Sequence, residues 1–133
     1  MPEEELYSEG IESASKTYAV AENLVIVITI GIGFAGMVPL LNVAGVPILS
    51  IAYVLFLAVM LGPVLRKHLC THCYYHGRWC HCGWGRLASR LGYAKGSGNK
   101  ALGGKLAGLT WGILMAGPIL AMIVGIVLYG ITV

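Results

Sequence analysis

The sequence predicts an all-α integral membrane protein with three transmembrane helices: an antiparallel hairpin, then a Cys/His-rich loop, then a third span. The chain is 57% hydrophobic and 11% charged, and its mean hydropathy of +0.78 lies outside the range of soluble proteins. Residues 23–65 and 106–133 contain no Asp, Glu, Lys or Arg. Because a helix crosses a bilayer with about 20 apolar residues, the first stretch accommodates two helices and the second accommodates one.

We expect the spans near residues 24–41, 47–65 and 109–131. Between the first two, Asn42, Gly45 and Pro47 predict a turn. A connection this short forces the two helices to run antiparallel. The chain therefore divides into an N-terminal arm (1–22), the hairpin (23–65), a loop (66–105) and the third span (106–133).

The N-terminal arm is acidic. Its first residues, MPEEE, lack the basic region of a secretory signal, so we expect no cleaved targeting peptide. Pro2 and the early glutamates suit the start of a surface or amphipathic helix, and a solvated tail is the alternative. The arm holds every acidic residue of the chain: Glu3, Glu4, Glu5, Glu9, Glu12 and Glu22.

The loop is basic. Cytoplasmic flanks of membrane helices collect Lys and Arg, so the loop and the N-terminus are predicted on the cytoplasmic side of the cell membrane, with the C-terminus outside. The acidic arm and the basic loop then share one surface. Eight of the nine basic residues lie in the loop: Arg66, Lys67, Arg78, Arg86, Arg90, Lys95, Lys100 and Lys105.

The spans carry packing signals rather than reactive groups. Gly117, Ala121 and Gly125 recur every four residues in the third span, a spacing that lets helix backbones approach closely. This favours packing against the hairpin, with a homo-oligomer contact as the alternative. No ionisable residue interrupts the span interiors, which disfavours a transporter or proton pump.

Residues 68–82, HLCTHCYYHGRWCHC, contain every cysteine and histidine of the chain. We expect the second span to continue as a helix to Gly77, which would put Cys70 and Cys73 on one side. A return after Gly77 would bring Cys80 and Cys82 towards the first pair. The histidines of the segment are predicted to support the site or to add ligands: His68, His72, His76 and His81.

The predicted ligands form a C-x2-C-x6-C-x-C pattern, and four thiolates bind Zn²⁺ or an iron–sulfur cluster. The spacing does not decide between these two cofactors. The segment also resembles a zinc knuckle in outline, with Cys70, Cys73, His76 and Cys80 as ligands, although its spacers are shorter than that family's. Disulfides are disfavoured in the cytoplasm, and Cys70 with Cys73 could instead cycle as a C-x-x-C dithiol.

Beyond the cluster, Arg86 and Arg90 with Leu87 and Leu91 predict a short basic helix on an anionic leaflet. The glycine-rich residues 96–105 fail the phosphate-loop template and are predicted to form a flexible linker. Lipid is the expected anionic partner, and no nucleic acid is expected.

These observations predict a membrane protein with a cytoplasmic metal site, acting as an accessory or docking subunit of a larger membrane complex. The alternatives are an iron–sulfur or dithiol electron-transfer subunit and a metal sensing or trafficking protein. An independent enzyme is not expected, because no nucleophile has an assignable base and no carboxylates are paired.

Overall fold

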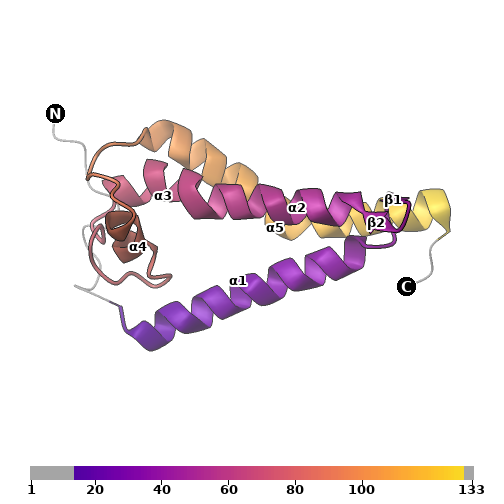
Figure 1. The fold of residues 1–133 in the computed structure, drawn as a ribbon, viewed down its shortest axis with the longest axis horizontal. Helices are drawn as coiled ribbons and strands as arrows, with labels where there is room; N and C mark the ends of the chain where they lie inside the picture. The colour runs from indigo at the N-terminus through magenta and orange to yellow at the C-terminus, as the bar shows by residue number, and fades with distance from the viewer. Residues whose placement is uncertain (1–13, 131–133) are drawn as a thin grey trace.

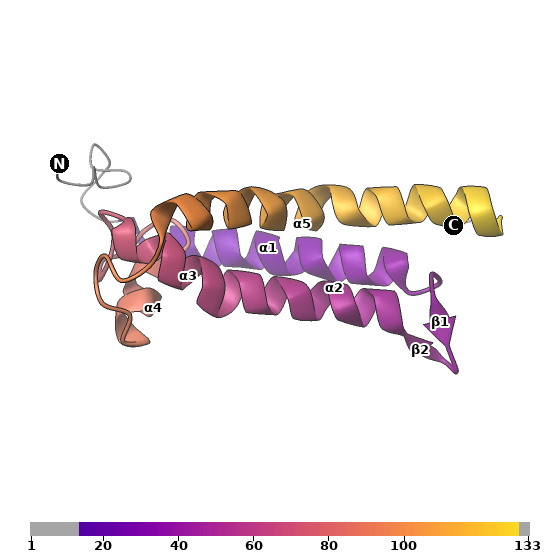
Figure 2. The ribbon, with the colours of Figure 1, turned by 90° about the horizontal axis from the view of Figure 1, so that it is seen from above.

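Three long helices run side by side and carry a compact cap at one end (Figures 1 and 2). The computed structural model describes residues 14–130, without the side chain of Tyr129, so most of the predicted acidic arm lies outside the described residues. Three helices are long and apolar enough to cross a membrane, as predicted. They span Lys16–Met37, Ile48–His72 and Lys100–Leu128.

The elements follow one another in a simple order. Helix α1 (Lys16–Met37) leads through strands β1 (Asn42–Val43) and β2 (Val46–Pro47) to α2 (Ile48–Val59). Helix α2 continues through the π turn η1 (Met60–Val64) into α3 (Leu65–His68) and the 3₁₀ turn η2 (Cys70–His72). Helix α4 (Trp84–Arg90) and the long helix α5 (Lys100–Tyr129) complete the chain.

Two spans begin earlier than predicted because polar side chains cap their first turns. The Ser15 side chain accepts a hydrogen bond from the Tyr18 amide (3.3 Å), and helix α1 starts at Lys16 rather than near residue 24. The Asn99 side chain accepts from the Leu102 amide (2.9 Å) and starts α5 at Lys100. The predicted flexible linker over residues 96–105 is therefore wrong for its second half, which is helical.

The predicted turn between the first two helices is confirmed. Strands β1 and β2 pair antiparallel, with Asn42 opposite Pro47 and Val43 opposite Val46. Ala44 and Gly45 both have positive φ angles (51° and 84°), as expected of a tight two-residue hairpin. The turn lies at the end of the bundle opposite the cap (Figure 2).

A tyrosine hydroxyl connects the three helices at mid-bundle. Pro118 lies inside α5 and has no N–H, so the carbonyl of Leu114 loses its helical partner. The Tyr53 hydroxyl of α2 donates to that carbonyl (3.2 Å). Gly33 of α1 provides the room, because a Cβ there would lie 2.7 Å from the Tyr53 oxygen and 2.8 Å from Pro118 Cγ. The Tyr53 hydroxyl can therefore lie between α2 and α5 only because α1 carries a glycine at this level.

The predicted contact face of the third span is confirmed in part. Gly125 is buried against Leu40, and Ala121 packs on the core. Gly117 meets only its own helix, where the nearest atom to an added Cβ is 3.7 Å away on Ile113. Gly36 of α1 also contacts α5 closely, since an added Cβ would lie 2.9 Å from the sulfur of Met122.

The second span bends into the cap at a proline. In η1 the Leu65 amide donates to the Met60 carbonyl, one residue further back than in an α-helix, and this wider turn accommodates Pro63. The predicted continuation to Gly77 is wrong, because the α-helix ends at His68. Beyond His68, backbone hydrogen bonds to a distant segment replace those of the helix. The Thr71 carbonyl, for example, accepts from the Gly96 amide (2.8 Å).

Candidate functional site

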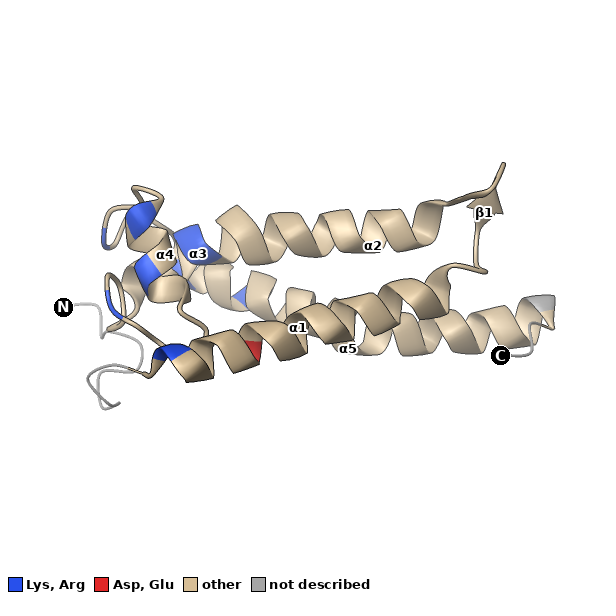
Figure 3. Cartoon of the chain, turned by 60° about the horizontal axis from the view of Figure 1, so that its bottom comes forward, with Lys and Arg blue, Asp and Glu red and all other residues tan. Residues whose placement is uncertain are grey.

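The cap, defined here as residues 69–99, holds seven of the eight Cys and His residues and lies at the charged end of the bundle. Figure 3 shows the Lys and Arg residues of the described part gathered at this end, with Glu22 as the acidic group on α1 nearby. The hairpin end and the middle of the bundle carry apolar surface instead. This separation of charge is what a helical protein with one basic membrane flank requires.

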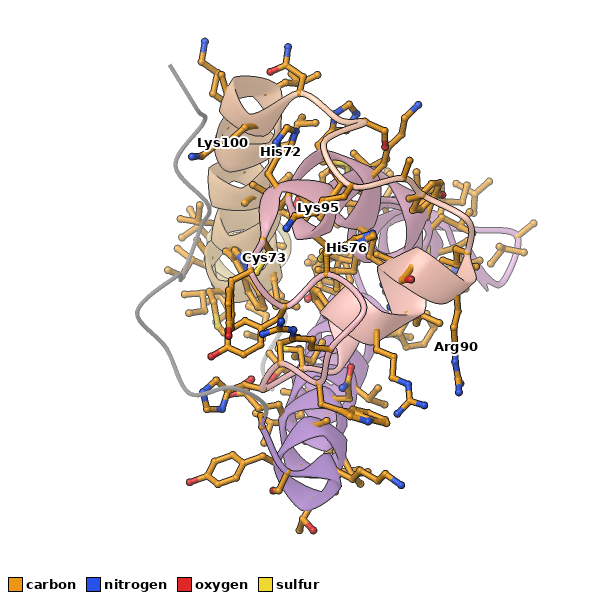
Figure 4. The ribbon with its side chains drawn as sticks, turned by 90° about the vertical axis from the view of Figure 1, so that its left-hand side faces the viewer. His72, Cys73, His76, Arg90, Lys95 and Lys100 are labelled. Atoms are coloured by element: carbon orange, nitrogen blue, oxygen red, sulfur yellow. The ribbon has the colours of Figure 1, made fainter. Side chains whose placement is uncertain are left out.

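Three histidines brace the loop that leads into α5. The His68 Nδ1 atom accepts from the Asn99 amide (3.0 Å). The His72 Nε2 and His76 Nε2 atoms lie 2.7 Å from the Gly98 carbonyl and 2.9 Å from the Tyr93 carbonyl, so each N–H donates to backbone. Figure 4 looks onto this end and shows His72 and His76 on the segment that carries Cys73. These bonds give the three histidines a structural role in the loop, and their predicted role at a metal site stays a prediction.

Two glycines allow the loop before α5 to pack closely against α3. An added Cβ at Gly98 would collide with the Lys67 carbonyl, and one at Gly103 would lie 2.9 Å from the His68 carbonyl. The loop and the first turn of α5 therefore press directly on the end of α3. Glycines that the sequence suggested were flexible are needed for close packing.

The fourth histidine has another role. His81 is exposed and meets Tyr18 of α1 edge to face, with ring centroids 5.6 Å apart. It makes its contact on the α1 side of the cap, whereas the other three face the loop.

Asn23 fastens the second half of the cap to α1. Its side-chain amide donates to the Cys82 carbonyl (2.7 Å) and to the Ala19 carbonyl (2.6 Å), and its oxygen accepts from the Trp84 indole (3.0 Å). No local pattern in the sequence marks this role, because two of the three partners, Cys82 and Trp84, lie about sixty positions away. A polar Asn at the start of an otherwise apolar span is the sequence feature that could have indicated this role.

The four cysteines lie in turns and irregular segments of the cap. Each is half-buried and none forms a disulfide. Cys70 begins η2 and Cys73 follows it in extended conformation. Cys80 closes a turn by accepting from the Gly83 amide (3.0 Å) through its carbonyl. The chain return predicted from the sequence therefore occurs, although it follows a 3₁₀ turn rather than a helix.

The thiols lie close enough to influence one another electrostatically. Cys70 lies within electrostatic range of Cys73 and Cys80, and Cys82 lies within range of Cys80 and Cys70. Among residues 14–130, however, no three His, Cys, Asp or Glu side chains converge in a geometry that would hold a metal ion. The fold brings the predicted ligands into one neighbourhood without forming a coordination shell.

Cys82 is the most strongly perturbed thiol outside the spans. Burial raises its pKa to about 12, and the Glu22 carboxylate, which accepts from its sulfur at 3.3 Å, adds to the rise. At neutral pH this sulfur is therefore a protonated, weakly nucleophilic group. A metal would have to displace its proton.

No protein-family model matches the chain, and no curated protein and no solved structure is significantly similar to it. Any function must therefore be argued from the residues themselves.

Proposed function

We propose that this chain is a small three-span membrane protein whose four cap cysteines bind a soft metal, as Zn²⁺ or an iron–sulfur cluster, and that it serves as an accessory or docking subunit of a larger membrane complex. The observation that carries the proposal is the return of Cys80 and Cys82 to the neighbourhood of Cys70. Soft thiolates in this number select such metals.

The cap supports metal binding by being braced on both sides of the thiols. Its first half is fixed by His72 and His76, and its second half by Asn23. Because the cysteines lie in turns between these supports, coordination needs rotation of side chains and adjustment of turns rather than folding of a free loop. The residues that would hold the metal are Cys70, Cys73, Cys80 and Cys82.

The histidine bonds resemble those seen around metal sites. Ligating histidines commonly donate one N–H to a backbone carbonyl, which orients the other ring nitrogen. His72 and His76 both donate from Nε2 in this way. They are the additional ligands to consider if fewer than four thiolates bind.

Elemental analysis with an absorption spectrum, on protein purified without air in detergent, tests the proposal. One zinc per chain without visible absorption would support a structural docking module, and iron with acid-labile sulfide and a broad visible band would support a redox subunit. Protein with neither metal would contradict the proposal.

Single serine substitutions then define the ligand set. Cys70→Ser, Cys73→Ser, Cys80→Ser and Cys82→Ser should each lose the metal if all four bind. His81→Ala is the matched control, since His81 is exposed and makes its ring contact with Tyr18. Retention of metal by any serine variant removes that residue from the set.

A dithiol centre is the second candidate, favoured by thiols that lie near one another outside a coordination geometry. Two thiols would then give two electrons and two protons to a membrane or cytoplasmic acceptor while an S–S bond forms. Metal-free protein that reversibly loses two hydrogens on oxidation, measured by mass spectrometry, would support it.

We propose that the cap and N-terminus face the cytoplasm, because the basic residues cluster at the cap end. Since all cysteines lie in the cap, labelling with a membrane-impermeant maleimide shows on which side of the membrane the cap lies. Labelling should occur in inside-out vesicles and not in intact cells, and the reverse pattern would overturn the assignment.

A further inference from the structure

A groove of about 520 Å³ lies where the cap meets the outer face of α1. One wall is the apolar surface of α1, formed by Val20, Leu24 and Val27, which are 68%, 57% and 63% exposed. These side chains belong to the first candidate span, so in a membrane this wall continues into the acyl region. The other wall is formed by α3 and the cap.

This second wall is strongly cationic. Arg66 comes from α3, while Arg86 and Arg90 lie one helical turn apart on α4, and all three line the groove. No Asp or Glu is among the described residues that line it. Three positive charges beside an apolar wall, without a compensating carboxylate, favour an anion attached to a hydrocarbon chain.

Two of the arginines lie within cation–π distance of indole rings. The Arg66 guanidinium lies 5.5 Å from the centre of the Trp84 ring, and that of Arg86 lies 4.9 Å from the centre of the Trp79 ring. A cation–π contact holds a guanidinium beside the ring while its N–H groups can still donate to phosphate oxygens. Tryptophans at this level are also typical of the membrane interface.

One donor of Arg66 has no acceptor among the described residues. The Nε atom of Arg66 is buried and makes no hydrogen bond to any described residue. A buried N–H without a partner is costly, but this atom has almost no exposed surface, so the phosphate would be bound by the terminal N–H groups of the arginines and not by this Nε. Figure 4 shows Arg90 extending from α4 away from the loop braced by His72 and His76, so this residue takes no part in that bracing.

We infer that this groove binds one anionic phospholipid, with its phosphate on Arg66, Arg86 and Arg90 and one acyl chain along Val20, Leu24 and Val27. The inference requires the helices to lie in a membrane. Cys82 also lines the groove, but none of the groups assigned to the lipid is a thiol. The groove gives the chain a fixed lipid rather than a diffuse attraction to an anionic surface.

The test is titration of the wild-type protein in neutral detergent with a short-chain phosphatidylglycerol, read by tryptophan fluorescence and native mass spectrometry. Saturable binding of one lipid, at least about tenfold tighter than phosphatidylcholine with the same chains, is expected. Equal affinity for the two headgroups would overturn the inference. Inorganic phosphate binding as tightly as the lipid would also overturn it, because the groove would then be a free-phosphate site.

A matched pair of variants separates the groove from the general charge of the cap. Arg86→Gln/Arg90→Gln removes two charges inside the groove, and Lys67→Gln/Arg78→Gln removes two exposed charges outside it. The first should weaken lipid binding about tenfold or more, and the second less than about threefold. Equal losses of lipid affinity in the two variants would show that the lipid is attracted by the general surface charge, and would overturn the inference.

Metal content is the internal control. Both variants keep all four cysteines, so an unchanged metal content with lost lipid binding separates the groove from the thiol site. If the groove variant does not fold, the headgroup comparison on wild-type protein still decides the question.

Discussion

The bundle and the cap use opposite strategies to bring backbone segments together. In the bundle, α1 and α5 approach because glycines such as Gly33 and Gly36 remove side chains from the interface. In the cap, imidazole and amide groups from His72, His76 and Asn23 hold backbone carbonyls. The bundle thus excludes polar groups apart from a few satisfied hydroxyls, while the cap is built from side-chain bonds to the main chain. Packing should therefore control the stability of the bundle, and single hydrogen bonds that of the cap.

The largest effect is expected from overpacking the bundle. Gly33→Leu would force a side chain into Tyr53 and Pro118 and should destabilise the protein by about 3 kcal/mol or more, measured as thermal unfolding in detergent. Gly31→Leu is the control, since nothing lies within 4 Å of a Cβ there. Similar melting temperatures for the two variants would refute the close approach at Gly33.

A smaller, local effect is expected from loosening the cap. His76→Phe removes the bond to the Tyr93 carbonyl and should cost about 1 to 2 kcal/mol locally, with no change in the bundle. Hydrogen exchange of the Gly96 amide, which is bonded to Thr71, should then quicken about tenfold. His81→Phe should leave that amide unchanged. Faster exchange throughout the helices of His76→Phe would mean that the cap and bundle are not separable.

The polar contact inside the bundle should be worth about 1 kcal/mol. Tyr53→Phe leaves the Leu114 carbonyl without its donor. Pro118→Ala restores an N–H that can pair with the same carbonyl, so Tyr53→Phe should cost less in that background. A double-mutant cycle by thermal unfolding measures the difference, and strict additivity would show that the proline does not create the need for the hydroxyl.

The smallest effect concerns Cys82. The pKa of Cys82 is higher in the folded protein than in the unfolded chain, so the protonated thiol stabilises the fold. This contribution is fully present below the unfolded pKa of about 8.5 and is lost as pH rises towards about 12. Glu22→Gln removes the acceptor that adds to the rise and should speed alkylation of Cys82 at pH 8 several-fold, read by peptide mass spectrometry. A rate equal to that of wild type would show that burial alone sets the pKa.

Composition predicted the bundle well and the cap poorly. Uninterrupted apolar runs defined three helices, and Asn42, Gly45 and Pro47 located the turn. The starts of α1 and α5 were missed because helices extend beyond the apolar run when Ser15 or Asn99 caps them. An apolar window detects the membrane-compatible part of a helix, not its length.

For the candidate site, the sequence could identify the reactive residues but not their partners. The return of the chain after Gly77 was predicted from that glycine. The acceptors of His72 and His76 lie 26 and 17 positions downstream in a glycine-rich segment, and no local pattern announces them. Arg66 likewise joins Arg86 and Arg90 only through tertiary folding.

The π turn at Met60–Val64 sets the rotational phase of everything that follows it in the second span. A turn with one additional residue advances later side chains by about 100° relative to an uninterrupted α-helix. Arg66 lies just beyond this turn, and so does the start of the cysteine segment. A one-residue deletion within Met60–Val64 would keep the same amino acids in the cap while turning the Arg66 side chain out of the groove and away from Trp84.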